Sequence, residues 1–128
     1  MSEARRNRLE GELQRVLAEL IARGVKDPRV GNVTITQVAL APDLSTARVY
    51  FVPFAGRHTP AEVGAGLTHA GGYLRGEVGR RLGLRHAPRL AFVFDEQLDR
   101  ARQLTDLIDD AVKTDRERSS DAPDEPAR

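Results

Sequence analysis

The sequence contains no cysteine and no tryptophan, and its few aromatic residues are four phenylalanines and two tyrosines. The absence of cysteine excludes disulfides, thiolate metal sites and cysteine nucleophiles, and the scarcity of aromatic rings predicts a mostly aliphatic core. No apolar run approaches the ~18 residues of a membrane-spanning helix, and the start of the sequence lacks the apolar segment of a signal peptide. We therefore expect a cytoplasmic protein without membrane association, long enough at 128 residues for one domain with a buried core.

Lysine is also scarce, because only Lys26 and Lys113 occur and every other Lys or Arg position is an arginine. The charges are unevenly distributed. Residues 66–90 contain five arginines and one acid, a net charge of +4, whereas residues 95–113 contain six acids and three cations, a net charge of −3. Arginine binds phosphate through two parallel hydrogen bonds, although a GC-rich genome would produce the same preference. The basic segment predicts an anionic partner.

The chain is organised around a glycine-rich stretch from Thr59 to His86 that has the apolar spacing of a helix. Thr59 and Glu62 have the spacing of a capping box, and Pro60 stands at the first helical position. The apolar residues at helical spacing are Val63, Leu67, Ala70, Leu74, Val78 and Leu82. These features predict that a helix begins near residue 60.

Glycines interrupt this helical pattern, since seven of the 11 in the chain lie in residues 64–83. Each glycine inside a helix costs about 0.5–1 kcal/mol relative to alanine, so one long helix is not expected. We predict two helices, at about 60–70 and 72–83, that meet at a kink formed by Ala70, Gly71 and Gly72.

The segment before this stretch predicts one helix and two strands. Residues 5–23 have an apolar stripe with arginines around it, and Gly24 is a typical helix stop. Residues 32–41 and 46–54 have the alternation of strands, and the short turn between them predicts an antiparallel hairpin. The alternation changes phase near Gln37, which predicts a β-bulge.

The segment after the glycine-rich stretch predicts a third strand at 88–95 and a last helix at 96–112. Residues 114–128 have no large apolar residue, and we expect a disordered charged tail there. The resulting domains are residues 1–113 and the tail. The order of helices and strands predicts an α+β fold, a three-stranded sheet with helices on one face.

No arrangement typical of catalysis occurs in the sequence. The serines lie near the termini or in a turn, and none belongs to a nucleophile-elbow pattern. The histidines at 58, 69 and 86 are isolated, without the pairing of a metal site. Asp95 and Glu96 are adjacent, but we expect them to cap the following helix rather than to act as acid and base. We therefore predict that the protein is not an enzyme and has no cofactor or metal.

Several segments resemble the ribosome-binding factor A family. The resemblance covers about residues 5–110, in order and without large gaps. Each motif is modest alone, but the set is specific. The matching segments are Arg8–Leu20, KDPR at 26–29, VALAPDLSTARVY at 38–50, AGGYLR at 70–75, LGLR at 82–85 and PRLAFVFD at 88–95.

This resemblance implies a type II KH-like fold in which a helix–kink–helix, centred on an Ala-x-Gly element, replaces the usual GxxG loop. Ala70–Gly72 occupies that element. The sequence does contain a GxxG match, Gly76–Gly79, but we reject it as a phosphate clamp because it lies within the second helix and includes Glu77. Glycine there would permit close helix packing instead.

The resemblance also implies a function. The family comprises non-catalytic factors that bind the free 30S subunit during late maturation, near the 5′ end and the decoding region of 16S rRNA. They assist 5′ processing and matter most in the cold. We expect the same partners here, and a monomer.

The arginines are the candidate RNA-binding residues. Arg80 and Arg81 should point away from the apolar stripe of the second helix. Two other interpretations remain open, a protein-interaction module whose basic face meets an acidic partner and a small hydrolase with no catalytic group that we can name. The predicted RNA-binding residues are Arg75, Arg80, Arg81, Arg85 and Arg89, with Arg5, Arg6 and Arg8 as a second set.

Overall fold

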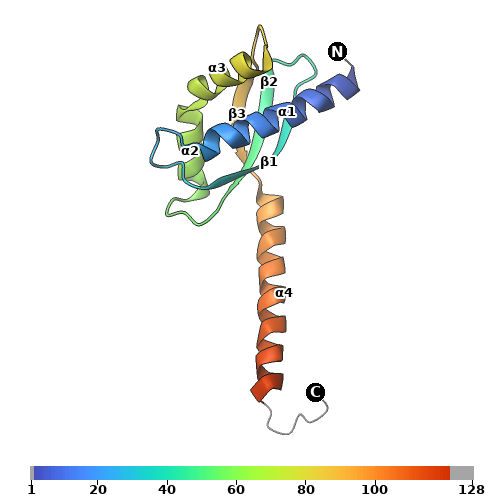
Figure 1. Ribbon diagram of the computed structural model, residues 1–128, viewed down its shortest axis with the longest axis vertical. Helices are drawn as coiled ribbons and strands as arrows, with labels where there is room; N and C mark the ends of the chain where they lie inside the picture. Colours follow the sequence, from blue (N-terminus) through green and yellow to red (C-terminus); the bar gives the residue numbers. More distant parts are fainter. Residues whose placement is uncertain (1, 122–128) are drawn as a thin grey trace. The chain divides into compact units, whose positions relative to one another are not determined.

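The computed structural model describes residues 2–121, and the chain forms two compact units, one up to Asp95 and one from Glu96 on. The first unit contains all three strands and the first three helices (Figure 1). The second unit is a single described helix, which we treat by itself. Within residues 2–121 no helix is long and apolar enough to cross a membrane.

The first helix, α1 (Glu3–Ala22), begins where Ser2 caps it, because the Ser2 Oγ accepts a hydrogen bond from the Arg5 N–H at 3.2 Å. Its predicted apolar stripe is buried against the sheet, which confirms the amphipathic interpretation. The buried residues of α1 are Leu13, Val16, Leu17, Leu20 and Ile21. Each fully buried leucine stabilises the fold by about 1.5–3 kcal/mol relative to an exposed one.

The sheet has the order β1-β2-β3, with β1 and β2 antiparallel and β2 and β3 parallel. The pairing slips within β1, since Ile35 lies opposite Phe51 while Gln37 lies opposite Tyr50. Thr36 is therefore the extra residue, and the bulge predicted near Gln37 is confirmed. The strand bounds are β1 (Val33–Leu40), β2 (Thr46–Pro53) and β3 (Arg89–Phe94).

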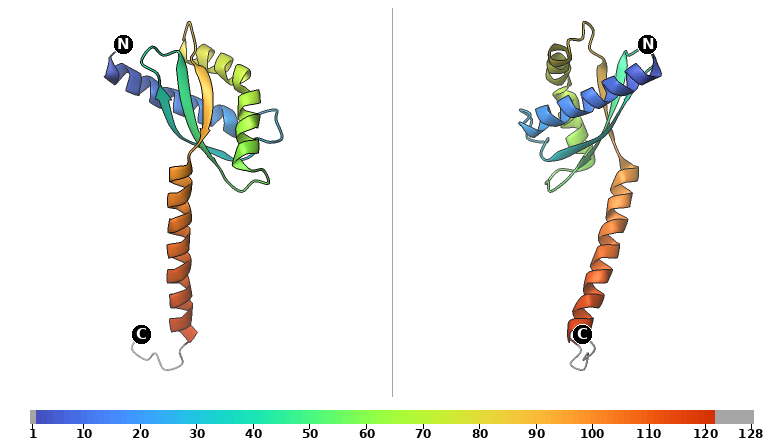
Figure 2. Two further views of the ribbon diagram at one scale, coloured as in Figure 1. Left: turned by 180° about the vertical axis from the view of Figure 1, so that it is seen from behind. Right: turned by 45° about the vertical axis from the view of Figure 1, so that its right-hand side comes forward.

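The glycine-rich stretch forms two helices, α2 (Pro60–His69) and α3 (Gly71–Leu82), as predicted. The capping box is also confirmed, because the Glu62 N–H donates to the Thr59 Oγ1 at 3.2 Å and the Thr59 N–H donates to Glu62 Oε1 at 3.0 Å. The helices α1, α2 and α3 lie on one face of the sheet (Figures 1 and 2). The core lies between this face and the three helices.

The last helix, α4 (Glu96–Asp121), is longer than predicted. Residues 114–121, which we expected in a disordered tail, are helical, and residues 122–128 of that tail lie outside the described part. The expectation of disorder rested on the lack of large apolar residues, but a helix does not require an apolar stripe. Within α4 the Gln103 Nε2 donates to Asp99 Oδ2 at 3.1 Å. The domain boundary expected after residue 113 stays a prediction.

Candidate nucleic-acid interface

The two helices of the glycine-rich stretch are separated by one residue, Ala70, which has φ −82° and ψ 0°. The Ala70 N–H donates to the Gly66 carbonyl, and the Ala70 carbonyl accepts from the Leu74 N–H, both at 3.0 Å. The chain therefore keeps one helical hydrogen bond on each side of Ala70. The predicted kink is confirmed, and α3 begins with no side-chain cap on its first N–H groups.

Gly71 and Gly72 leave the surface at the start of α3 open. A Cβ added to either would meet nothing within 4 Å, and neither has a positive φ. Gly76 is equally open, so the close helix packing that we expected at the GxxG match is wrong for Gly76. Gly79 approaches Ala87 and Leu84, in the segment after α3, rather than another helix.

The first predicted set of RNA-binding residues lies on α3, on the segment that follows it and at the first residue of β3. All five residues are exposed. The predicted orientation toward solvent is confirmed for Arg80, whose side chain is 74% exposed, whereas the Arg81 side chain is 28% exposed because it lies against Glu19 of α1. Arg75 on α3 lies against the segment after the helix, since its Nε donates to the Ala87 carbonyl at 3.0 Å. We call these residues the basic cluster, and they are Arg75, Arg80, Arg81, Arg85 and Arg89.

Two arginines of the basic cluster have acidic partners within the chain. Arg80 lies 3.1 Å from Glu77, and Arg81 lies 3.3 Å from Glu19 on α1. One side chain of each pair is partly covered, since Glu77 is 18% and Arg81 28% exposed. A phosphate group that binds either arginine would have to replace this carboxylate. Within residues 2–121, Arg85 and Arg89 form no ion pair, and their guanidinium groups are available to an anion.

The second predicted set lies at the start of α1, where Arg5 and Arg8 are exposed and Arg6 is half-buried. This end of α1 extends away from α3 in every view (Figures 1 and 2). The structure therefore does not bring the second set together with the basic cluster. Any RNA contact by these three residues would be a separate contact.

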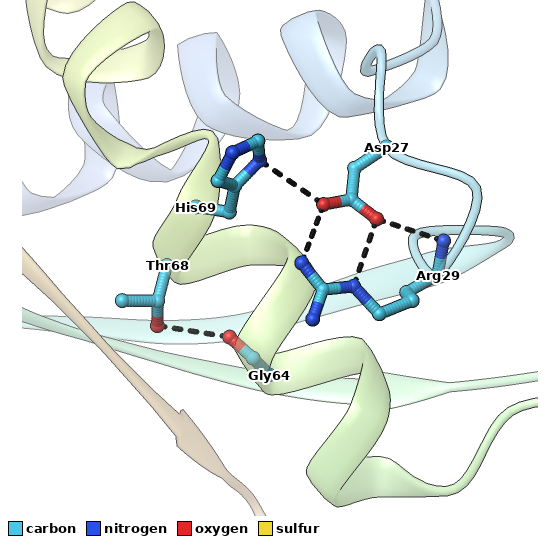
Figure 3. A network of polar contacts seen from close by, with 5 residues as sticks. All are labelled: Asp27, Arg29, Gly64, Thr68 and His69. Atoms are coloured by element: carbon cyan, nitrogen blue, oxygen red, sulfur yellow. Dashed lines mark hydrogen bonds and ion pairs between the residues drawn. The ribbon is translucent and has the colours of Figure 1, made fainter.

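A buried carboxylate, which the sequence analysis did not identify, fixes the loop before β1 against the kink (Figure 3). Asp27 is 6% exposed and accepts hydrogen bonds from the Arg29 backbone N–H, Nε and Nη2 at 2.9, 3.0 and 2.7 Å. His69, the last residue of α2, places Nδ1 at 3.2 Å from Asp27 Oδ2. The spacing of Asp27 and Arg29 is typical of an Asx turn, which is the signal that could have identified this contact.

The contacts of Asp27 have an electrostatic consequence. The hydrogen bonds from the Arg29 side chain and backbone hold the pKa of the Asp27 carboxyl far below its ordinary value, and the nearby His69 acts in the same direction. The same contact raises the pKa of Arg29. Both groups therefore stay charged near neutral pH, and the ionised Asp27 carboxylate is the group that contacts His69 on α2.

Two of the three histidines each contact one carboxylate, which the sequence analysis did not predict. His69 contacts Asp27, and His58 lies 3.2 Å from Glu62 at the start of α2. Neither pair is part of a larger set, because residues 2–121 contain no group of three or more His, Asp or Glu residues that could hold a metal ion.

Asp95 accepts a hydrogen bond from Thr36 Oγ1 at 2.7 Å, which links the bulge of β1 to the end of β3.

Comparison with known proteins identifies the family. The family model described as ribosome-binding factor A matches residues 5–108. The chain belongs to this family. The ribosome-binding factor A of Azoarcus sp. strain BH72 is 42% identical over 118 residues, which cover 92% of this chain and 94% of that protein.

Two structures of ribosome-binding factor A from Thermus thermophilus are similar to this chain. The crystal structure has a TM-score of 0.61 and 33% identity and covers 69% of this chain and 93% of that one. A homology model fitted into a cryo-electron-microscopy map of a 30S–ribosome-binding factor A complex has a TM-score of 0.56 and 35% identity. The match covers 66% of this chain and 89% of that one. These matches confirm the type II KH-like fold, with the kink at Ala70 within the helix pair.

Proposed function

We propose that this protein binds the free 30S subunit as a non-catalytic assembly factor and contacts 16S rRNA through the basic cluster. The observation that carries the proposal is the family match over residues 5–108 together with a related factor placed in a 30S complex. The fold supplies a matching surface, because five exposed arginines lie on α3 and the segment after it. Arginine side chains position a protein on RNA mainly through phosphate contacts.

The contact itself would exchange weak ion pairs for phosphate. The Arg80 and Arg81 side chains would leave Glu77 and Glu19, while the side chains of Arg85 and Arg89 would bind directly. The small residues at the start of α3 would allow the RNA backbone to approach closely. The uncapped N–H groups there favour negative charge as a helix N-terminus does.

The finer role that we propose is late maturation of 16S rRNA, including assistance with 5′ processing by an enzyme other than this protein. The factor would act in the cytoplasm as a monomer and would matter most in the cold. This part of the proposal follows from the family likeness alone.

Sedimentation with purified ribosomal particles tests the proposal. The protein should co-sediment with 30S subunits in a sucrose gradient and much less with 50S subunits or 70S ribosomes. Prior digestion of the particles with RNase should abolish the association. Equal association with all three particles would contradict the proposal, and association that survives RNase would favour an acidic protein partner instead.

A further inference from the structure

A pocket of about 350 Å³ lies between the loop after α1 and the kink. Its volume is within the range of about 300–1,000 Å³ that is typical of ligand sites. The wall on the loop side comes from residues 24–27, and the other wall comes from the end of α2 and the first turn of α3. The lining residues are Gly24, Val25, Lys26, Asp27, His69, Ala70 and Tyr73.

The wall between the loop and α2 is fixed before any ligand arrives. Asp27 accepts three hydrogen bonds from Arg29 and contacts His69, so its carboxylate is fully occupied and holds the loop to the end of α2 (Figure 3). Gly66 lies beneath this loop, and a Cβ there would come within 2.8 Å of Val30 Cγ2. A preformed wall lowers the ordering cost of binding.

The rim of the pocket carries an aromatic ring that the fold does not use. Tyr73 is 58% exposed, and the one ring contact within the described chain joins Phe51 to Phe94. The exposed side chain of Lys26 lies on the opposite wall and brings a cation to the same pocket. An open aromatic face with a neighbouring cation is the arrangement that unpaired bases of single-stranded RNA require.

We propose that this pocket takes one unstacked nucleotide of the bound RNA, with the base against the Tyr73 ring and the phosphate near Lys26. The proposal rests on the proposed function, since it names a contact within the RNA complex. It differs from the arginine contacts, because a base-stacking site distinguishes single-stranded RNA from a duplex, whereas phosphate contacts alone do not. The kink places this pocket beside the start of α3.

The absence of tryptophan from the chain allows a direct optical test. Tyr73→Trp introduces a single tryptophan at the rim, and its emission should be quenched on titration with a single-stranded adenylate hexamer. A double-stranded RNA of the same length should cause much less quenching at equal phosphate concentration. No change in emission up to millimolar hexamer, or equal quenching by the duplex, would overturn the proposal.

Substitutions at Tyr73 then separate stacking from simple apolar contact in binding to 30S subunits. Tyr73→Ala should weaken 30S affinity about 5- to 150-fold, the range expected for loss of one stacked base. Tyr73→Phe keeps the ring and should bind within about twofold of the wild type, whereas Tyr73→Leu should resemble Tyr73→Ala. The melting temperatures should stay alike, because this side chain is largely exposed.

The outcomes distinguish this inference from the proposed function. If the unmodified protein does not bind 30S subunits, the proposed function fails, and the hexamer titration still decides the pocket. If the unmodified protein binds but Tyr73→Ala binds equally well, the pocket proposal alone is wrong. If Tyr73→Leu binds like the wild type, the pocket takes an apolar group from a protein, and the nucleotide proposal is overturned.

Discussion

Two positions in the same helix pair show two different uses of glycine. Gly66 on α2 is packed, since a Cβ there would lie 2.8 Å from Val30 Cγ2 and 3.1 Å from Arg29 Cβ. Gly71 and Gly72 at the start of α3 are open, with nothing within 4 Å. In a helix each of these three glycines lowers stability relative to alanine, but close packing accounts for the presence of glycine only at residue 66. Packing does not account for the open glycines, and we propose that they admit a contact outside the fold.

The largest expected effect is a loss of stability when Gly66, the packed glycine, is substituted. Gly66→Val forces atoms into the loop that Asp27 holds, so we expect the free energy of unfolding to fall by about 1–3 kcal/mol. Gly72→Ala is the matched control, and it should leave stability unchanged or raise it by up to about 1 kcal/mol. Urea denaturation measures both, and equal effects of the two substitutions would remove the contrast between packed and open glycines.

The next largest effect is expected at Asp27, whose contacts hold the loop that packs against Gly66. The folded pKa of Asp27 is lowered from its ordinary value of 3.8, so its contribution to stability is present above that value and is lost as the pH falls through the folded pKa. Asp27→Asn should therefore lower the melting temperature at pH 7, and the difference from the wild type should shrink in acid below about pH 4. Asp106→Asn, which removes a carboxylate of an exposed α4 residue, serves as the control. A difference that is constant with pH would contradict the assignment.

Substitution of Gly72, one of the two open glycines, should have a smaller effect on stability but a clear effect on RNA binding. Gly72→Val should change the free energy of unfolding by no more than about 0.5 kcal/mol, because the new side chain meets nothing and valine suits a helix slightly better than glycine. Affinity for 30S subunits should nevertheless fall, since the branched side chain would obstruct the approach of RNA. Unchanged affinity in a filter-binding titration would show that glycine is merely tolerated there.

The smallest effect is expected outside the helix pair. Deletion of residues 114–128 should leave the melting temperature of the first unit nearly unchanged, because this segment has no large apolar residue that could join the core. A decrease of several degrees in a thermal scan would show that this segment supports the fold.

The sequence predicted those features that depend on local patterns. Glycine content and spacing predicted a kink at residues 70–72, and the phase change of the strand predicted a bulge near Gln37. The structure has them at Ala70 and Thr36, because both patterns act within a few residues. The contact of Asp27 with His69 was not predicted, since it joins residues from two distant segments. For the same reason the partners of Arg75 and Arg81 came only from the structure.

The end of α4 was missed for another reason. Composition suggested disorder after residue 113, but a lack of large apolar residues does not by itself prevent a helix. Apolar spacing correctly predicted that this segment is a helix. It did not predict burial, because apolar side chains of α4 such as Leu104 and Leu107 are exposed.

The salt dependence of 30S affinity tests most directly whether the basic cluster binds RNA. Arg85→Ala/Arg89→Ala removes two exposed arginines without ion pairs in the described chain, so folding should be unaffected. Loss of two phosphate contacts should reduce the slope of log affinity against log salt by about 1–2. The control Arg48→Ala/Arg57→Ala removes equal charge from β2 and the loop after it, and its slope should match the wild type. A wild-type slope in the Arg85→Ala/Arg89→Ala protein would contradict the assignment of this surface.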